Sequence, residues 1–394
     1  MWFHMKGVSK VACPLFHEPQ KPGENMRAKK ILFGILILFF SLLIKTSPCI
    51  AKETSLTLIY TSNTLGEVES CGCPEAGDAG GLGRRSYYID TVRKEAKYLL
   101  TLDGGDALVL SFFDRESERE KARRRAGVVL KIYEKLGYDA LNIGDTDLGL
   151  GVEYLRTLQK KSKIPFLSAN LKEKKTGRPI FKSHLVKEVD GMRIGIIGLL
   201  TPDIHPFIQK ELKSYFIEDP IKTALETINR YLADCDHIIA LAHLTPIEIQ
   251  TFTKRIPKIS IIIGGNDRSF IFPKQFDHSI YVQTDAFGAH VGRMNLNLIK
   301  GSDEFVDILP RTMIQKNIKE VQKKMEEPKY AKEIQKLQEM QKQFHEQLKK
   351  MPGTEGKNTF ENHLLLMHPG MESDKEIEKL IDSSRDQLKR PIPW

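Results

Sequence analysis

The sequence is short of several features that would narrow its class at once. Only five of its 394 residues are cysteine, and Cys13 and Cys49 fall in amino-terminal segments that we expect to lie outside the fold. Cys235 precedes an apolar run and is expected to be buried, which leaves Cys71 and Cys73 as one informative pair. No internal repeat is present, so a repeat array is excluded.

No nucleic-acid-binding motif accompanies the positive charge of the chain. Lys and Arg number 60 against 51 Asp and Glu, which gives a formal net charge of +9. Such an excess suits nucleic acid or an anionic membrane as a partner. The aromatic and basic pattern of nucleic-acid modules is missing, however. Lysines spread along exposed helices account for the charge, and no nucleic-acid partner is expected.

The apolar run near the amino terminus is shorter than the about 20 residues that a membrane-spanning helix needs. It covers Ile31–Ile44, after a basic segment and before small residues. This order is typical of a secretory signal peptide over residues 26–51, with cleavage after Ala51. An uncleaved membrane anchor is the alternative. We predict an exported, periplasmic or extracytoplasmic protein, with residues 1–25 as a disordered leader or an upstream extension of the true start.

Short apolar runs alternate with helical patterns over residues 52–310, which predicts an α/β domain with buried strands. The expected strands are 56–60, 98–102, 140–143, 166–168, 194–199, 237–242 and 259–263. The expected helices are 84–97, 115–136, 152–161, 220–233 and 246–254. Three further strands, 281–284, 290–298 and 305–309, predict that the domain closes with antiparallel structure.

Residues 311–394 are rich in Lys, Glu and Gln and predict a charged helical tail. Apolar residues recur there at alternating steps of three and four, from Ile334 to Met351, which is typical of a helical seam or coiled coil. Self-association through residues 314–351, as an interaction scaffold, is one hypothesis for this segment.

Polar residues follow five of the expected strands. They are Asn63, Asp106, Asp145, His243 and the group Asn266–Arg268. Because the strands of an open α/β sheet place their sites at their carboxyl ends, these residues are expected to converge. The alternatives are that His243 is a core histidine, that Asp145 and Asp147 cap the helix beginning at Val152, and that Arg268 is an exposed loop cation.

In this order the strand-end residues resemble the calcineurin-like metallophosphoesterases, and especially their periplasmic 5'-nucleotidase and UDP-sugar hydrolase branch. The resemblance covers residues 54–309 and includes Gly80-Gly-Leu-Gly-Arg-Arg85, Ile194-Gly-Ile-Ile-Gly-Leu-Leu-Thr201 and Val282-Gln-Thr-Asp-Ala-Phe-Gly288. It implies a metallophosphoesterase-type α/β sandwich that hydrolyses a phosphate ester, such as a nucleotide, with two divalent metal ions.

The resemblance assigns roles to this chain only in part. Asp106 and His243 match a metal-bridging aspartate and a metal ligand, and both are catalytic candidates. Asn63, Asp145 and Asn266 stand at other ligand positions. The residue types favour Mg or Mn over Zn, at a site of reduced metal content. Arg268 and Arg84 are candidates to bind the substrate, a small phosphorylated molecule or other anion.

Several histidines of the family pattern are replaced. The motif Asp-x-His-Gly is Asn63-Thr-Leu-Gly66 here, and Gly-Asn-His-Glu is Gly144-Asp-Thr-Asp147. The motif Gly-His-x-His is Gly265-Asn-Asp-Arg268. A tight two-metal centre is therefore not expected.

Cys71-Gly-Cys73 follows the first motif closely. Such a pair can hold a soft metal, form a strained disulfide or supply a nucleophile of low pKa. A local structural disulfide or two inert thiols are the simpler alternatives. The pattern resembles a divergent exported subfamily of 5'-nucleotidase-like proteins, which implies redox or metal chemistry. A non-hydrolytic redox or metal-binding protein, in which Cys71 and Cys73 are the active residues, is thus the alternative to the hydrolase.

Overall fold

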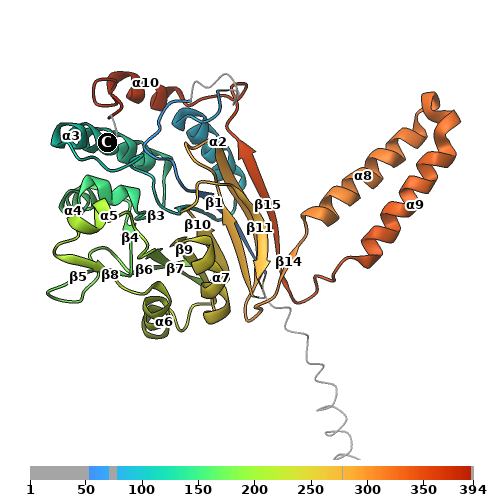
Figure 1. Ribbon diagram of the computed structural model, residues 1–394. Coiled ribbons are helices and arrows are strands. Elements are labelled where there is room, and N and C mark those ends of the chain that lie inside the picture. The colour runs from blue at the N-terminus through green and yellow to red at the C-terminus, as the bar shows by residue number, and fades with distance from the viewer. Residues whose placement is uncertain (1–52, 71–77, 277, 392–394) are drawn as a thin grey trace, which may run out of the picture. The chain divides into compact units, whose positions relative to one another are not determined.

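The computed structural model describes residues 53–70, 78–276 and 278–391, all within the unit formed by residues 51–394. Two β-sheets of this unit face one another and helices cover them (Figure 1). The first sheet has the strand order β14 (Phe305–Asp307), β15 (Asn358–Leu366), β13 (His290–Ile299), β1 (Glu53–Thr61), β2 (Leu99–Asp103), β3 (Ala140–Asn142), β4 (Phe166–Leu167). The second has the order β11 (Ile271–Phe276), β12 (Ser279–Gln283), β10 (Ile261–Gly264), β9 (His237–His243), β7 (Met192–Leu200), β6 (His184–Val189). A separate pair is formed by β5 (Leu171–Glu173) and β8 (Tyr215–Ile217).

The side chains of β1 show how the layers pack. Leu58 and Tyr60 are fully buried in the core between the sheets, together with Ile196 of β7 and Ile239 of β9. Ile59 points to the opposite face, as the period of two in a strand requires. It joins the core formed with the helices that cover the first sheet. Both faces of β1 are thus apolar, which is typical of a central strand in an α/β sandwich.

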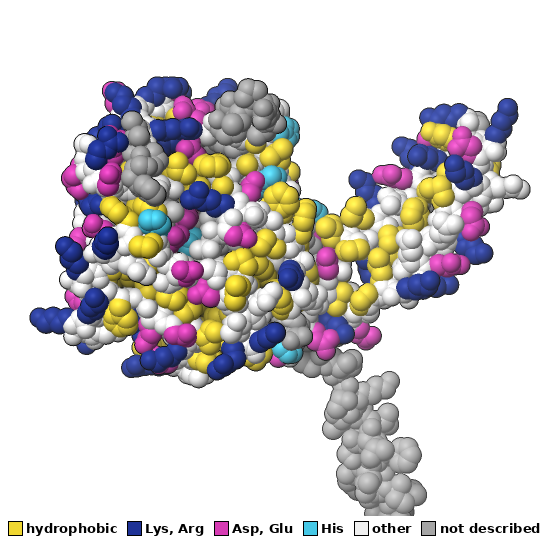
Figure 2. All heavy atoms as spheres, viewed as in Figure 1, with side chains coloured by type: hydrophobic (Ala, Val, Ile, Leu, Met, Phe, Trp, Pro, Cys, Tyr) yellow, Lys and Arg dark blue, Asp and Glu magenta, His cyan; other side chains and the backbone are white. Residues whose placement is uncertain are grey.

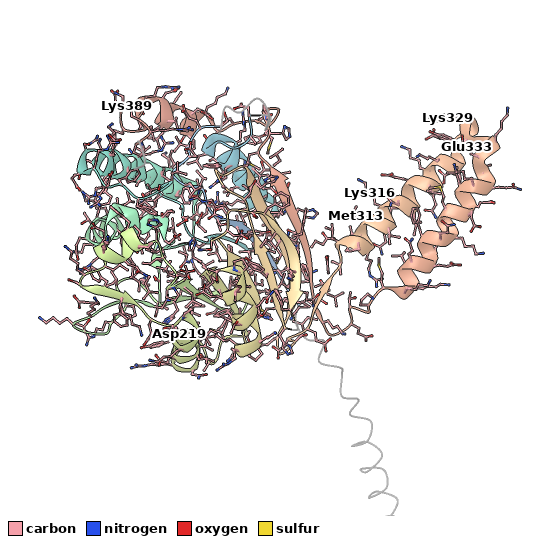
Figure 3. All side chains as sticks on the ribbon, viewed as in Figure 1. Asp219, Met313, Lys316, Lys329, Glu333 and Lys389 are labelled. Carbon is pink, nitrogen blue, oxygen red and sulfur yellow. The ribbon has the colours of Figure 1, made fainter. Side chains whose placement is uncertain are left out.

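Helices cover both outer faces. The core outside the first sheet includes α2 (Leu82–Glu95), α3 (Glu116–Leu136), η1 (Thr146–Leu150), α4 (Val152–Lys161), α5 (Pro206–Glu211) and α10 (Lys375–Ser383). The core outside the second includes α6 (Pro220–Tyr231) and α7 (Pro246–Arg255). Asp219 begins α6 by accepting the Lys222 N–H at 2.7 Å (Figure 3). The predicted α/β class is confirmed.

Strand β15 was not among the expected strands. It lies between β13 and β14, antiparallel to the first and parallel to the second. The chain therefore returns to the sheet after residue 357, and the prediction of helical structure throughout residues 311–394 is wrong for this strand. The predicted closing strands also differ in their pairing, because β12 joins one sheet while β13 and β14 join the other.

Two helices separate β14 from β15. They are α8 (Leu309–Glu326) and α9 (Ile334–Lys350), joined by η2 (Pro328–Glu333), and they pack against each other. Met313 and Lys316 lie on α8, and Glu333 precedes α9 (Figure 3). Leu337 of the predicted seam is buried. The seam thus contacts a helix of the same chain, and self-association through residues 314–351 stays a prediction.

The surface and the remaining cysteine agree with the composition. Figure 2 shows Lys and Arg interspersed with Asp and Glu on the visible face, rather than gathered in one patch. Cys235 is a free, buried thiol, as expected. In the described part of the chain no helix has the length and apolar character needed to cross a membrane. The expected signal or anchor segment lies outside the described residues.

Candidate active site

Loops that follow five strands carry the predicted site residues. Asn63 follows β1, Asp106 follows β2, Asp145 follows β3, His243 ends β9 and Asn266 follows β10. Strands β1, β2 and β3 are parallel, and so are β9 and β10. The carboxyl ends within each sheet therefore point the same way, which is where such folds place their sites.

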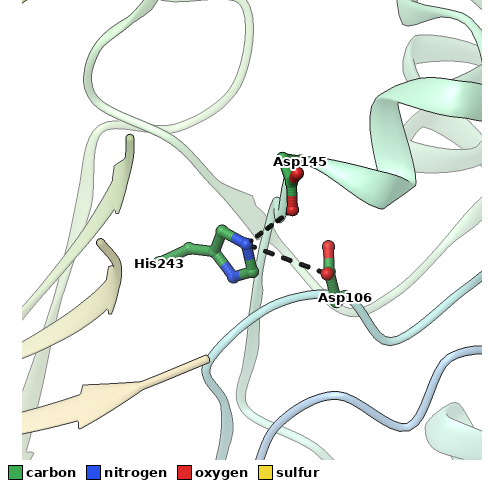
Figure 4. Close-up of side chains that lie close together, drawn as sticks. All are labelled: Asp106, Asp145 and His243. Atoms are coloured by element: carbon green, nitrogen blue, oxygen red, sulfur yellow. Dashed lines mark hydrogen bonds and ion pairs between the residues drawn. The ribbon is translucent and has the colours of Figure 1, made fainter. Parts of the chain in front are cut away.

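Three of these residues meet across the two sheets, and we call Asp106, Asp145 and His243 the acidic cluster (Figure 4). Nε2 of His243 lies 2.9 Å from Oδ1 of Asp145 and 3.8 Å from Oδ2 of Asp106. One ligand atom from each residue lies within 4.8 Å of the others. Asp106 and His243 are almost fully buried, while Asp145 is partly exposed.

Glycines allow the loops to approach this closely. A Cβ on Gly144 would lie 2.0 Å from Oδ1 of Asp106, and one on Gly105 would lie 3.0 Å from Nδ1 of His243. Gly105 also has a φ of +119°, which side-chain-bearing residues rarely adopt. The Gly-Gly pair before Asp106 is therefore required by the geometry of the acidic cluster.

Burial and the charges within the acidic cluster shift the pKa values of its members. Burial lowers the pKa of His243, but the charges of Asp106 and Asp145 outweigh burial and raise it to about 9. Burial raises the pKa of Asp106 well above its usual range, and only the His243 charge opposes this strongly. Perturbed pKa values of this kind concentrate at functional sites. The raised pKa of His243 means that its protonated form is favoured beside Asp106 and Asp145.

Comparison with curated proteins places the chain near 5'-nucleotidases, although no family model matches it. It is 25% identical over 312 residues to a snake venom 5'-nucleotidase of Gloydius brevicauda, covering 69% of this chain and 50% of that protein. It is 24% identical over 314 residues to protein UshA of Salmonella pullorum, covering 69% and 55%. The chain thus spans about half the length of the curated relatives it matches.

Solved structures agree on the fold. The 5'-nucleotidase precursor of Thermus thermophilus matches with a TM-score of 0.59 at 20% identity, over 84% of this chain and 59% of that one. The calcineurin-like phosphoesterase YfkN of Bacillus subtilis matches with a TM-score of 0.60 at 15% identity, over 86% and 99%. These likenesses show that the chain shares its fold with calcineurin-like phosphoesterases and 5'-nucleotidases. Its acidic cluster lies at the strand ends where the resemblance to these proteins predicted a metal site.

Residues that stand where the resemblance expects histidines have other contacts. Leu65 is buried and lines a small cavity whose wall also includes Val109, Phe113 and the charged residue Arg125. The Thr146 hydroxyl donates to the Val109 carbonyl at 2.9 Å. Neither side chain offers an imidazole or a free hydroxyl to a substrate. Proton transfer at these two positions is therefore excluded.

Asp147 supports the loops, and neither it nor Asp145 caps α4. Its carboxylate accepts the N–H groups of Gly144 at 3.0 Å, Asp106 at 3.1 Å and Leu108 at 3.0 Å. Burial raises the pKa of Asp147 to about 7, against the lowering effect of these backbone donors. The residue before α4 is Gly151, which has no capping side chain. Asp147 therefore joins the loops after β2 and β3.

The donor set of the acidic cluster fits a divalent cation. Two carboxylates and one imidazole already lie within reach of a single ion. Asn63 is fully buried, and neither its amide nitrogen nor its amide oxygen has a hydrogen-bond partner among the described residues. An unpaired buried polar group costs about 1–3 kcal/mol, so a ligand is the natural partner. Asp106, Asp145 and His243 would hold the ion, with Asn63 on the adjoining loop.

The other predicted site residues are not part of the group formed by Asp106, Asp145 and His243. Asn266 is partly exposed on the loop after β10. Arg268 has a φ of +60°, and its guanidinium lies 3.3 Å from the Leu110 carbonyl. Arg84 donates to the carbonyls of Asp78 at 2.8 Å and Gly80 at 3.0 Å, so its guanidinium holds its own loop. The binding roles of Arg268 and Arg84 and the ligand role of Asn266 stay predictions.

Cys71 and Cys73 lie outside the described residues. The residues flanking their segment, Ser70 and Gly80, pair as an isolated antiparallel bridge. Gly80 adjoins the loop after β12, since its Cβ would lie 3.2 Å from the Phe287 carbonyl. The backbone N–H of Phe287 in turn donates to the Asn63 carbonyl at 2.8 Å. The redox and metal hypotheses for the two cysteines stay untested predictions.

Sequence reasoning missed a second buried cluster, which we call the arginine network: Arg85, Asp103, Tyr133, Tyr138, Thr61 and Thr64. Arg85 donates to Tyr133 at 2.9 Å and to Thr64 at 3.0 Å. Asp103 accepts from Thr61 at 2.7 Å and from Tyr133 at 3.1 Å. The network joins the loops that carry Asn63 and Asp106. Its sequence signal was Arg85 after the glycines of the segment 80–83.

Proposed function

We propose that this protein is a metal-dependent hydrolase of small phosphate monoesters with a reduced, single-ion site. The observation that carries the proposal is the acidic cluster, whose three ligand atoms lie within 4.8 Å of one another at converging strand ends. Relatives named 5'-nucleotidase support the reaction class. A divalent ion bound there would neutralise phosphate charge and activate water for attack on phosphorus.

The replaced histidines support a single ion. A second ion in the family pattern would need imidazoles where this chain has Leu65, Asn266 and Arg268. Leu65 is buried and offers no ligand atom. Oxygen ligands with one imidazole favour Mg or Mn.

The chain's own residues would position the substrate. Arg268 lies on the loop after β10, whose first residue, Gly265, would place a Cβ 3.1 Å from Nδ1 of His243. A guanidinium on this loop suits a phosphate group, which arginine binds through two parallel hydrogen bonds. Phe270 and Phe272 follow it, with rings 5.4 Å apart and exposed fractions of 47% and 66%. We propose that they contact the organic part of the ester.

The test is turnover of p-nitrophenyl phosphate and of adenosine monophosphate with Mn, Mg or Zn. Asp106→Ala should lower kcat/KM by more than about 100-fold, because loss of an outer-shell partner alone costs about 10–100-fold. Asp303→Ala is the matched control, since this exposed carboxylate follows β13 at the opposite end from the site. Absence of turnover with every metal would overturn the proposal.

We propose further that the hydrolase is exported. The support is the basic segment, apolar run and small residues of positions 26–51. Fractionation of cells that produce the full chain should recover it outside the cytoplasm, with an amino terminus at residue 52. Recovery in the cytoplasm with residues 26–51 retained would contradict export, and retention of these residues in the membrane fraction would indicate the anchor instead.

A further inference from the structure

A hollow of about 680 Å³ lies between α6 and the segment that connects β5 to β6. None of the strand-end loops of the candidate active site contributes to it. Its volume falls in the range of about 300–1,000 Å³ that is usual for small-molecule sites. The hollow is therefore large enough for a ligand of metabolite size, separate from the acidic cluster.

The charge of the hollow is positive. Three cationic residues line it, Lys172, Arg178 and Arg230, against the one carboxylate of Glu226. Lys172 pairs with Glu218, which lies outside the lining. In the described ranges Arg178 and Arg230 have no ion pair with a carboxylate, and Glu226 lies 4.0 Å from Lys222. Two arginines thus line the hollow without an ion pair among the described residues, and the cationic residues of the lining outnumber its carboxylate.

Apolar and aromatic groups complete the wall. Phe181 is buried, and Tyr231 is 46% exposed. One face of the Tyr231 ring stacks on His184, with ring centroids 4.8 Å apart, and the Arg230 guanidinium lies 5.2 Å from the ring centroid. Stacking restricts the ring, so it offers a fixed surface to a ligand. The wall of the hollow thus combines polar and charged side chains with two aromatic ones, which suits a ligand that has both an anionic group and an apolar body.

We propose that this hollow binds a small organic anion, whose phosphate or carboxylate group pairs with Arg178 and Arg230 and whose body contacts Tyr231. Guanidinium groups suit such anions because their planar donors match two oxygens at once. The concave shape, with two elements closing around it, favours a small molecule over an extended acidic peptide. The site is independent of the proposed hydrolase activity.

The experiment is calorimetric titration of the full chain with phenylphosphonate, in buffer containing EDTA so that the candidate active site holds no metal. We expect one binding event that weakens by at least about tenfold in Arg178→Gln/Arg230→Gln. Lys254→Gln/Arg255→Gln removes two exposed cations from the end of α7 and should bind as the wild type does. Asp106→Ala should also bind unchanged, which separates this proposal from the hydrolase.

A further variant tests the ligand body. Tyr231→Ala should weaken phenylphosphonate more than inorganic phosphate, while thermal unfolding checks that each variant is folded. No binding of either probe by the wild type would overturn the proposal. Equal weakening in the Arg178/Arg230 and Lys254/Arg255 variants would overturn it as well, since binding would then follow net charge alone.

Discussion

Two buried polar clusters lie side by side at the strand ends, and they differ in how completely their groups are paired. In the arginine network, Oδ2 of Asp103 accepts two hydroxyl donors, and Oδ1 accepts the Gly105 N–H at 2.9 Å. Around the acidic cluster, Nδ1 of His243 and both amide atoms of Asn63 have no partner in the described part of the chain. The burial of a polar cluster therefore does not by itself tell whether the cluster stabilises the fold or binds a ligand.

The difference indicates a division of roles. The arginine network joins the loop after β1 to the end of β2, because Thr64 belongs to that loop and Asp103 is the last residue of β2. Its groups are mostly paired, so it stabilises the fold. Around the acidic cluster, polar atoms lack partners among the described residues, and the pKa values of Asp106 and His243 are raised. Both features are expected of a site that binds a ligand. Substitutions in the arginine network should therefore lower stability, and substitutions in the acidic cluster should alter ligand binding.

The largest expected effect on stability comes from Arg85→Met. It removes the buried positive charge that lowers the pKa of Asp103 and the donors to Thr64 and Tyr133. Leaving a buried charge uncompensated costs about 3–5 kcal/mol. Urea unfolding followed by circular dichroism measures the loss. Arg84→Met is the matched control, because its pair with Asp78 is partly exposed and should cost no more than about 1 kcal/mol. Equal losses in the two variants would contradict the assigned role of the network.

The next effect is a pH dependence from Asp103. Burial raises its pKa from 3.8 to about 6, so the folded state favours the protonated form. Its contribution to stability is full below pH 3.8 and is lost as the pH rises through 6. The two pKa values imply a change of about 3 kcal/mol. The free energy of unfolding of the wild type should thus fall relative to Asp103→Asn as the pH rises through this window.

Glu218→Gln provides a control of opposite sign for the Asp103 measurement. Hydrogen bonds from Lys172 and Lys222 lower the pKa of Glu218 from 4.5 to about 2. Its contribution to stability is present above pH 4.5 and is lost as the pH falls through 2. Identical pH profiles for Asp103→Asn and Glu218→Gln, each relative to the wild type, would contradict both assignments.

A smaller effect on stability, in the other direction, is expected for Asp106→Asn. The amide removes a buried charge that burial disfavours, and it keeps an oxygen for the Thr146 N–H, now 3.0 Å from Oδ1. In EDTA the variant should be as stable as the wild type or more stable by about 0.5–2 kcal/mol, as is common when a functional group is removed. Thermal and urea unfolding test this. A loss as large as that of Arg85→Met would erase the distinction between the clusters.

The smallest effect on stability is expected for Arg268→Ala. The side chain is exposed and contacts a carbonyl at 3.3 Å, so the free energy of unfolding should change by no more than about 0.5 kcal/mol. If Arg268 binds phosphate, KM for a phosphate monoester should rise about tenfold, the loss expected for a charged hydrogen bond. An unchanged KM would leave Arg268 as a loop cation.

The positions of the strand-end residues could be predicted because they depend on the local sequence alone. Each follows a short apolar run, and parallel strands bring such residues to one edge. Asp106 and His243 were thus expected together and do meet. Helix α4 has the predicted bounds, Val152–Lys161, since its apolar spacing and the following Ser162 are local signals too.

Distant hydrogen-bond partners explain what the sequence did not reveal. Strand β15 places Asn358 and Asn362 in buried positions, where polar residues argue against a strand. Asn358 accepts the Ile299 N–H at 2.7 Å, and Asn362 accepts from the Tyr60 hydroxyl at 3.1 Å. The same holds for Arg85, which is buried because hydroxyl groups far away in the chain receive its donors. The hydrophobic periodicity of the sequence does not reveal such distant partners.

The central claim is that the acidic cluster holds one divalent ion, and calorimetric titration with Mn²⁺ tests it most directly. The wild type should bind one ion, and Asp106→Ala and His243→Ala should lose that binding while remaining folded. Asp303→Ala should bind as the wild type does. Two ions per chain would contradict the reduced site. Absence of binding by the wild type, or equal binding by all four proteins, would contradict the claim itself.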